Sequence, residues 1–350
     1  MNVKSEVKIN RDLNKDDLIV ITGAGGFIAG ALTRHFHDLG YTRIRAVDKK
    51  PLPDWYQHVP GVEALCMDLS EKENAGRAVE GAVEIYNLAA DMGGMGFIER
   101  FRIQCLRSIL INTHMIEAAY RAGARRYFYS SSACAYNTTL QQDAHVRPLK
   151  ESDAYPAMAE RGYGWEKLMS EMFCQEYWAE RKFETHIARF HNVYGPHGTW
   201  DGGREKAPAA ICRKVIDAKA SGKHEIMIWG DGKQTRSYMF IDDCIKGIDM
   251  IMHCDELIAT PINLGSNELI SVSELVSLAE KIGGVKLERK YDLTAPRGVV
   301  GRNSDNTFIK QVLGWEPTIS FHDGLTKTYA WIEQQYADRK SGKQTVQDHV

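Results

Sequence analysis

Tyr163 and Lys167 lie four residues apart in the run Tyr-Gly-Trp-Glu-Lys, a spacing of about one helical turn. Side chains at this spacing share one face of a helix. A lysine ammonium beside a phenol favours the phenolate, so we expect Lys167 to lower the pKa of Tyr163 towards neutrality. Such a pair can take a proton from a substrate hydroxyl while a nicotinamide takes a hydride. The spacing alone is common, and by itself it would indicate no more than a surface helix pair.

A glycine-rich turn upstream supplies the other half of that chemistry. The apolar run 18–21 leads into Thr-Gly-Ala-Gly-Gly, and a helical pattern follows. Gly23 and Gly26 let the backbone approach a pyrophosphate, which then meets the N-terminus of the helix at Phe27 and Ile28. The alternative is a glycine-rich turn without a ligand, but a strand before and a helix after the turn are typical of dinucleotide binding.

Two aspartates follow the next predicted strands. Asp48 ends the strand at 43–47, and Asp68 lies just beyond the strand at 62–66. A carboxylate at the position of Asp48 accepts hydrogen bonds from the adenosine ribose, which favours NAD over NADP. Asp68 is either a contact of the adenine amino group or an ordinary loop aspartate. The alternative of NADP is kept open by three nearby cations that could hold a 2′-phosphate, Arg43, Lys49 and Lys50.

The elements around these residues alternate between strands and helices. Strands are predicted at 18–21, 43–47, 62–66, 83–88, 126–130 and 185–189, and long helices at 27–39, 102–121 and 163–181. This rhythm gives a parallel sheet covered on both faces, so the fold class is α/β, with a Rossmann-type doubly wound sheet over residues 1–190. Ligands bind at the carboxyl ends of such strands. Ser131, Ser132 and Cys134 follow the fifth strand and are therefore expected at that edge.

The rhythm changes after residue 190. Helical patterns recur at 208–220, 241–253, 272–281 and 323–335, with short strands such as 225–229 and 261–264 between them. We expect residues 191–335 to form a smaller, partly interleaved substrate domain whose segments cross back to the first domain. Residues 1–17 are predicted to be a flexible N-terminus, and residues 336–350 a polar tail.

Bulk properties exclude several classes of function. Lys and Arg number 44 against 46 Asp and Glu, so no strong field attracts nucleic acid or acidic membranes. No stretch approaches the roughly 18 apolar residues of a membrane span. The seven cysteines are scattered without Cys-x-x-Cys spacing, which predicts neither a disulfide framework nor a metal site. The sequence therefore predicts a soluble, cytoplasmic protein.

The glycine turn, Asp48, Ser132 and the Tyr163–Lys167 pair together resemble the extended short-chain dehydrogenase/reductase superfamily of nucleotide-sugar enzymes. Between about residues 18 and 335 the chain more narrowly resembles the GDP-mannose 3,5-epimerase family. Six runs carry this resemblance: NLAADMGGMGFI at 87–98, SSAC at 131–134, RFHNVYGP at 189–196, GGREKAPAA at 202–210, WGDGKQTRS at 229–237 and GRNSDN at 301–306.

The resemblance implies NAD as cofactor and GDP-mannose as substrate, with GDP-L-galactose as product and GDP-L-gulose as a further product. Tyr163, helped by Lys167 and Ser132, would take the C4 hydroxyl proton while NAD takes the C4 hydride. The C4 ketone then acidifies the hydrogens at C3 and C5, and the family's acid/base pair falls on Cys134 and Lys206. A free thiol titrates at about 8.5, and we expect the lysine to favour the thiolate.

The resemblance also implies further substrate contacts and a homodimer. Lys214, Arg236 and Arg302 are expected to bind the diphosphate, because charge-assisted hydrogen bonds are strong there; otherwise they are surface cations. The helices at 102–121 and 164–181 are expected to form the dimer interface, although they fit ordinary sheet-covering helices equally well. The remaining substrate contacts that the resemblance implies are Gly93, Ala133, Asn192, Glu205, Ala207, Gln234 and Thr235.

The chain departs from the family in two places, and other functions fit it less well. Asn137-Thr-Thr replaces the usual proline and acidic residue, and similarity thins over 282–300. A 4,6-dehydratase needs acidic side chains near residues 133 and 134, where this chain has Ala and Cys. A 4-epimerase has no use for Cys134 or Lys206. Two alternatives stay open: the same chemistry on another nucleotide sugar, and an NAD-binding regulatory protein that has lost catalysis.

Overall fold

The computed structural model describes residues 9–343 and 345, and its centre is a parallel sheet of seven strands. The strand order is β3-β2-β1-β4-β5-β6-β11, which is the doubly wound Rossmann order with a seventh strand from the C-terminal part of the chain. The bounds are β1 Ile19–Thr22, β2 Ile44–Asp48, β3 Glu63–Cys66, β4 Glu84–Asn87, β5 Arg126–Ser132, β6 Glu184–Phe190 and β11 Pro261–Leu264.

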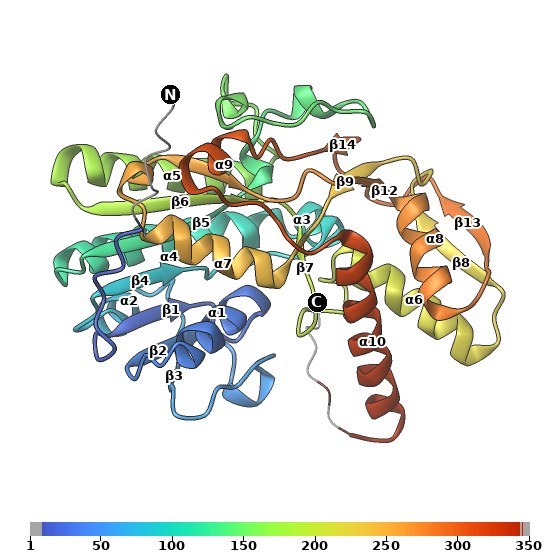
Figure 1. Ribbon diagram of the computed structural model, residues 1–350, viewed down its shortest axis with the longest axis horizontal. Helices are drawn as coiled ribbons and strands as arrows, with labels where there is room; N and C mark the ends of the chain where they lie inside the picture. Colours follow the sequence, from blue (N-terminus) through green and yellow to red (C-terminus); the bar gives the residue numbers. More distant parts are fainter. Residues whose placement is uncertain (1–8, 344, 346–350) are drawn as a thin grey trace, which may run out of the picture.

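Alternate residues of each strand supply two separate cores, because successive side chains point to opposite faces. Ile19 and Ile21 join the core under α1 (Phe27–Asp38) and α7 (Ile241–Met252). Val20 joins the core on the other face, under three helices. These are α2 (Lys72–Ala78), α4 (Arg102–Arg121) and α5 (Tyr163–Arg181). The fold class predicted from the sequence is therefore confirmed (Figure 1).

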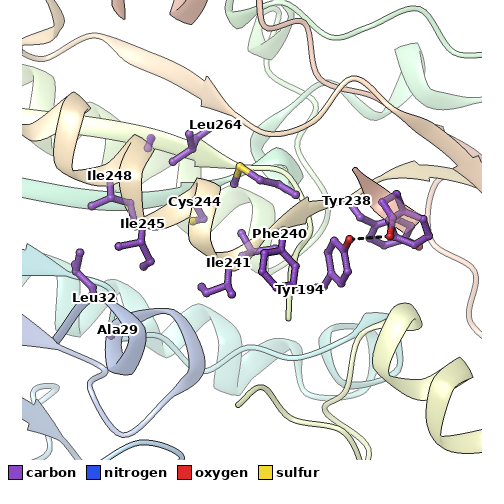
Figure 2. Close-up of a cluster of buried hydrophobic side chains, with 14 of the residues drawn as sticks. Ala29, Leu32, Tyr194, Tyr238, Phe240, Ile241, Cys244, Ile245, Ile248 and Leu264 are labelled. Atoms are coloured by element: carbon purple, nitrogen blue, oxygen red, sulfur yellow. Dashed lines mark hydrogen bonds between the residues drawn. The ribbon is translucent and has the colours of Figure 1, made fainter. Parts of the chain in front are cut away.

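The core under α1 and α7 joins distant parts of the chain. Figure 2 shows Ala29 and Leu32 of α1 on one side and Ile245 of α7 on the other, with Leu264 of β11 above. A Cβ on Gly247 would lie 2.3 Å from Leu264 Cδ1, so glycine allows α7 to lie this close to the strand. Two elements from the C-terminal half, α7 and β11, are thus part of the unit that contains the main sheet, which is the predicted interleaving.

A smaller unit projects from one end of the sheet (Figure 1). Three helices, α6, α8 and α10, pack together beside the parallel pair β8 and β13. Two further strand groups connect this unit to the sheet: β9 with β12 and β14, and β7 with β10. The bounds are α6 Ala207–Ser221, α8 Val272–Gly283, α10 Phe321–Lys340, β7 Val193–Tyr194, β8 Glu225–Trp229, β9 Thr235–Ser237, β10 Met239–Phe240, β12 Leu269–Ser271, β13 Glu288–Asp292 and β14 Gly301–Arg302.

Two short helices complete the chain, α3 (Met95–Arg100) and α9 (Thr307–Leu313). Neither was predicted, because six or seven residues carry too little periodicity to be recognised. The long helices at 102–121 and 163–181 have the predicted bounds. Within the described residues, no helix combines the length and apolar character needed to cross a bilayer.

Both predicted tails are partly ordered. Arg126 Nη1 donates to Asp12 Oδ1 at 2.8 Å, Arg11 pairs with Asp249, and Asn10 N donates to a carbonyl of the turn after α7. Residues 9–17 of the segment predicted to be flexible thus make contacts with β5 and with α7 and the turn after it, and residues 1–8 lie outside the described residues. The polar tail predicted from residue 336 begins as helix, since α10 continues to Lys340; residues 344 and 346–350 also lie outside the described residues.

Candidate active site

The glycine turn joins β1 to α1 at the carboxyl edge of the sheet. Gly23 has φ of +73°, and a Cβ there would lie 3.0 Å from Leu88 O, so both conformation and space require glycine. The N-cap of α1 is Gly26, which offers no side-chain cap, so the N–H groups of the first turn remain available to an anion. These features fit a pyrophosphate against Phe27 and Ile28, the contacts that the sequence predicts.

Asp48 ends β2 and reaches back to the glycine turn. Its carboxylate accepts hydrogen bonds from Gly25 N at 3.0 Å and from Lys50 N at 2.9 Å. Burial raises the pKa of the Asp48 carboxyl, and these backbone hydrogen bonds oppose that rise. A carboxylate has about four acceptor positions, so Asp48 retains capacity for two ribose hydroxyls. Asp68 also faces the cleft, and its carboxylate forms a turn with Ser70 through Oγ at 2.7 Å.

Of the three cations considered for a 2′-phosphate, Lys50 lines the cavity, with its Nζ 4.4 Å from the Tyr56 ring centre, and the other two have contacts of their own. Lys49 Nζ donates to both carboxylate oxygens of Asp91 at 2.8 Å. Arg43 precedes β2, at the opposite end of that strand from Asp48, and its Nη1 donates to Asp16 O. Arg43 is therefore remote from the ribose position, Lys49 is paired with Asp91, and the carboxylate of Asp48 at the end of β2 favours NAD.

One cavity of about 390 Å³, a volume in the usual range for ligand pockets, collects the predicted cofactor residues and four of the five predicted catalytic residues; Cys134 is not among the residues that line it. It runs from the glycine turn, past the ends of β2 and β4, to the start of α5 and the loop before α6. The predicted residues that line it are Gly23, Gly26, Phe27, Ile28, Asp48, Asp68, Gly93, Ser132, Tyr163, Lys167 and Lys206.

Tyr163 and Lys167 share the inner face of α5. Lys167 is 1% exposed, and its Nζ donates to Ser130 O at 3.0 Å and lies 5.4 Å from the Tyr163 ring centre. Burial raises the pKa of Tyr163 well above its ordinary value, Cys134 and Glu166 raise it further, and a hydrogen bond with Ser132 lowers it. The direction of this shift is opposite to the expected fall towards neutrality, because burial disfavours the phenolate.

The first turn of α5 rests directly on the turn that carries Cys134. Residues Ala133–Ala135 form a short 3-10 helix, η2, whose N-cap Ser132 accepts a hydrogen bond from Cys134 N. A Cβ on Gly164 would lie 2.2 Å from Cys134 O, so no larger residue fits there without backbone movement. Cys134 and Tyr163 share one apolar cluster with Phe97. The glycine after the tyrosine thereby fixes the thiol and the phenol relative to each other.

Arg302 forms a hydrogen bond with the Cys134 sulfur. Its guanidinium is buried and donates from Nη1 to Cys134 Sγ at 3.4 Å, from Nε to Gln141 Oε1 at 2.6 Å, and from Nη2 to Glu160. Burial and Glu160 raise the pKa of the thiol, and Arg302 lowers it. The structure adds a second cation to the expected one: Arg302 opposes the rise in the pKa of the thiol, but burial outweighs it, and the role of Lys206 at the thiolate stays a prediction.

Lys206 projects into the cavity from the N-cap of α6. Its Nζ has no hydrogen bond or ion pair with any side chain or backbone group in the described part of the chain. Burial and Arg302 lower the pKa of Lys206, and Cys134 raises it, which couples the two predicted acid/base groups. A lowered pKa makes an amine a better proton donor than an ordinary lysine, which suits a group that must return a proton.

The loop before Lys206 packs against the loop that follows β4. Gly94 N donates to Arg204 O at 2.9 Å, and a Cβ on Gly94 would lie 2.5 Å from Glu205 O. The Arg204 guanidinium lies 3.9 Å from the Phe97 ring centre. The runs MGGMGF and GGREKAPAA, which carry the most specific part of the resemblance, therefore pack against each other.

Several predicted substrate contacts lie outside the cavity lining. Lys214 Nζ donates to Met227 O at 2.8 Å, and Arg236 donates to backbone carbonyls that include Val299 O at 2.6 Å. Arg302 pairs with Glu160, and none of the three cations lines the cavity. Their role in binding a diphosphate stays a prediction. The other predicted contacts outside the lining are Ala133 and Cys134 in η2, Ala207 at the start of α6, Asn192, which donates to Ser237 O, Glu205, which pairs with Arg213, Gln234, which donates to Trp229 O, and Thr235, which donates to Ala144 O.

Sequence reasoning missed four residues that shape the site. Glu160 and Gln141 accept hydrogen bonds from Arg302, and Asp91, which lines the cavity, accepts hydrogen bonds from Lys49. Arg204 closes the wall over Phe97. Each of the four comes from a segment without helical or strand periodicity. Asp91 and Arg204 lie in two of the runs that carry the family resemblance, at 87–98 and 202–210, and only these runs could have pointed to them.

Comparisons with known proteins agree with this geometry. Residues 19–265 match the NAD dependent epimerase/dehydratase family. GDP-mannose 3,5-epimerase 1 of Oryza sativa subsp. japonica is 42% identical over 327 residues, which cover 92% of this chain and 83% of that protein. GDP-mannose 3,5-epimerase of Arabidopsis thaliana is 42% identical over 324 residues, covering 92% and 84%.

Solved structures show the same fold. UDP-glucose 4-epimerase of Thermotoga maritima, determined with UDP-glucose, has a TM-score of 0.80 at 22% identity and covers 91% of this chain and 99% of its own. UDP-glucose 4-epimerase of Thermus thermophilus, in complex with NAD, has a TM-score of 0.76 at 17% identity, covering 89% and 98%. At these identities the likeness concerns the fold alone.

Proposed function

Because this chain belongs to the NAD-dependent epimerase/dehydratase family, we propose that it converts GDP-mannose to GDP-L-galactose by inverting C3 and C5, with GDP-L-gulose formed where C5 alone inverts. The chain is an NAD-dependent nucleotide-sugar epimerase. The named substrate rests on its 42% identity with two plant GDP-mannose 3,5-epimerases.

One observation carries the proposal. Cys134 and Lys206 come from different elements, η2 and the N-cap of α6: Cys134 packs against Tyr163, Lys206 lines the cavity that Tyr163 also lines, and Cys134 raises the pKa of Lys206. An epimerase removes a proton from one face of a carbon and returns one to the other face, so it needs two acid/base groups on opposite sides. A 4-epimerase or a simple dehydrogenase would need only Tyr163, Lys167 and Ser132.

The residues then divide the reaction into two parts. When bound, NAD accepts the C4 hydride and later returns it. Tyr163 takes the proton of the C4 hydroxyl, with Ser132 as a hydrogen-bonding partner and Lys167 as a fixed charge below. The C4 carbonyl acidifies the hydrogens on C3 and C5, where Cys134 removes or supplies a proton from one side and Lys206 from the other.

Hydrogen exchange with solvent tests the assignment. The purified protein with NAD is given GDP-mannose in deuterated water, and the recovered sugar is analysed by NMR for deuterium at C3 and C5. Deuterium at both positions supports 3,5-epimerisation, and deuterium at C5 alone supports the gulose product. A panel of other nucleotide sugars identifies a different substrate, while NAD binding without turnover on any of them would support a regulatory protein.

We further propose that the protein is a homodimer in the cytoplasm. On α4, Ile103, Leu106 and Leu110 are 79%, 42% and 40% exposed, and on the neighbouring α5, Met169 and Met172 are 53% and 48% exposed. Five apolar side chains on two adjacent helices favour burial against a second copy. All seven cysteines are free, which suits a reducing compartment.

A further inference from the structure

The residue before the lysine of the catalytic pair is a buried acid that the mechanism above does not use. Glu166 is 2% exposed, and its Oε2 lies 3.9 Å from Lys167 Nζ. Oε2 is buried and has no hydrogen-bond partner among the described residues. An orphaned carboxylate oxygen beside a buried ammonium is costly unless the two charges stabilise each other.

The other oxygen of Glu166 is fixed by three side chains. Oε1 accepts hydrogen bonds from Asn112 Nδ2, from Ser170 Oγ at 3.2 Å and from Tyr129 OH at 3.3 Å. These donors come from α4, α5 and β5. A carboxylate held from three elements has a fixed direction, so Oε2 is aimed at Lys167 by the surrounding structure.

The donors belong to a longer chain of buried polar groups. Asn87 Nδ2 donates to Asn112 Oδ1 at 2.9 Å, and Thr22 Oγ1 donates to Asn87 Oδ1 at 2.7 Å. Thr22 immediately precedes the glycine turn. The hydrogen-bonded chain therefore connects the nucleotide-binding turn with the carboxylate beside the catalytic lysine.

We propose, on the basis of the function proposed above, that Glu166 is a positioning residue that holds Lys167 as an ammonium ion beside Tyr163. Lys167 has three N–H donors, and the structure shows one hydrogen bond, to Ser130 O. The Glu166 carboxylate supplies the negative charge that this buried cation otherwise lacks. With its ammonium fixed, Lys167 offers Tyr163 a constant positive charge while the tyrosine takes and returns the C4 hydroxyl proton.

The other charged and titratable groups around Lys167 do not replace Glu166. Glu171 of the same helix forms a bidentate pair with Arg189, through Nε at 2.9 Å and Nη2 at 2.7 Å. The remaining groups are phenols and thiols, namely Tyr163 on α5, Tyr129 on β5, Cys105 on α4 and Cys134 on η2. Among the described residues, Lys167 is also the one cation within 4 Å of Glu166.

The electrostatics agree in direction with this geometry. Burial lowers the pKa of Lys167, and Glu166 is the first group that opposes this fall. Burial likewise raises the pKa of Glu166, and Lys167 opposes that rise. Removal of the carboxylate charge should therefore let Lys167 lose its proton at a lower pH.

Glu166→Gln tests the proposal, because glutamine keeps an oxygen for Asn112 and removes the charge. We expect the alkaline limb of the kcat profile to move down by at least one pH unit, with KM for the nucleotide sugar changed less than threefold. Glu176→Gln removes a charge from an exposed position of the same helix and should leave the profile unmoved. A folded Glu166→Gln protein with the wild-type alkaline limb would show that Glu166 serves only structure.

A second measurement does not depend on folding of that variant. In the wild-type protein loaded with NAD and labelled with ¹³C-lysine, the Cε signal of Lys167 reports its charge, and Lys167→Arg assigns the signal. We expect an ammonium throughout pH 7 to 9; a neutral amine at pH 8 would overturn the proposal. If GDP-mannose is the wrong substrate, wild-type turnover fails on it while this charge state is unaffected, so the two failures are distinguishable.

Discussion

Arg302 Nη1 donates a hydrogen bond to Cys134 Sγ at 3.4 Å, while the same guanidinium pairs with Glu160 and Gln141. The three contacts fix the position of the arginine against the thiol. A hydrogen bond to sulfur from a cation favours the thiolate, and burial disfavours it. Arg302 thereby partly offsets the cost of a reactive thiolate in an apolar cluster.

Arg302→Met should separate the two halves of the reaction. Loss of the guanidinium raises the pKa of Cys134, and one unit of that rise corresponds to about a tenfold smaller thiolate fraction near neutral pH. Deuterium incorporation at C5 and C3 should therefore fall about tenfold or more, while NADH absorbance from C4 oxidation persists. The variant also leaves Glu160 buried without its partner, which should cost about 3 kcal/mol of stability in urea unfolding.

Cys134→Ser should remove the acid/base group and leave the redox part in place. We expect exchange at C5 and C3 to fall by about two to four orders of magnitude, because a hydroxyl does not ionise in this range. C4 oxidation should remain visible as NADH absorbance. Cys105→Ser alters a neighbouring thiol of the same apolar cluster and should retain exchange. Normal epimerisation by the Cys134 variant would exclude this thiol from the reaction.

Tyr163→Phe should abolish both signals, since C4 oxidation comes first and needs the phenol oxygen. The side chain is 5% exposed and lies in an apolar cluster, so phenylalanine should fold with little change in stability. NADH absorbance and deuterium incorporation are measured on the same sample. NADH that forms at the wild-type rate would contradict the role of Tyr163 as base.

His253 should make stability depend on pH at the other edge of the sheet. Its Nε2 lies 3.3 Å from Glu84 Oε1 and its Nδ1 3.1 Å from Asp249 Oδ1. Burial lowers the pKa of His253, but these two carboxylates outweigh it and raise the pKa to about 9. A raised folded-state pKa adds stability below the unfolded value of about 6.5, and this is lost as pH rises through 9.

The free energy of unfolding should therefore fall by up to about 3 kcal/mol between pH 6.5 and 9. Urea titrations at several pH values measure this slope. His253→Gln should flatten it, whereas His224→Gln, at an exposed position, should not. An unchanged slope in the His253 variant would show that another group is responsible.

Ile103→Asp should convert a dimer to a monomer, because it places a charge at the most exposed apolar side chain of α4. Light scattering after size-exclusion chromatography gives the mass. Leu293→Asp is a matched control, since Leu293 is 65% exposed and lies beyond β13, outside both helices. If wild-type protein is already monomeric, the proposed interface is wrong.

Much of the sheet was predictable because its strands are short apolar runs that end in glycine, aspartate or serine. Thr22-Gly23 and Asp48 mark the ends of β1 and β2, and the helices after Arg102 and Tyr163 begin and end at the predicted residues. Strands β7, β9, β10, β12 and β14 contain two or three residues each, which is too few for any period to appear.

The sequence could indicate which residues form the candidate site, but it could not indicate the directions of their pKa shifts. Spacing and family runs predicted Tyr163, Lys167, Cys134 and Lys206; three of these line one cavity, and Cys134 packs against Tyr163 in an apolar cluster. The pKa directions of Tyr163 and Cys134 depend on burial, which the sequence does not show. The partners of Arg302 lie 142 and 161 residues away along the chain, so no local pattern could reveal them.

The contact between Gly164 and the carbonyl of Cys134 has a consequence for how this scaffold changes its chemistry. Because the two backbones touch, neither the thiol nor the phenol can be re-aimed by a small shift of its own segment. Divergence towards another sugar reaction must therefore proceed by exchanging side chains on an unchanged frame, with acidic residues at 133 and 134 as the direct route to elimination. Directed evolution libraries should accordingly concentrate on side-chain identity at those two positions and keep residue 164 as glycine.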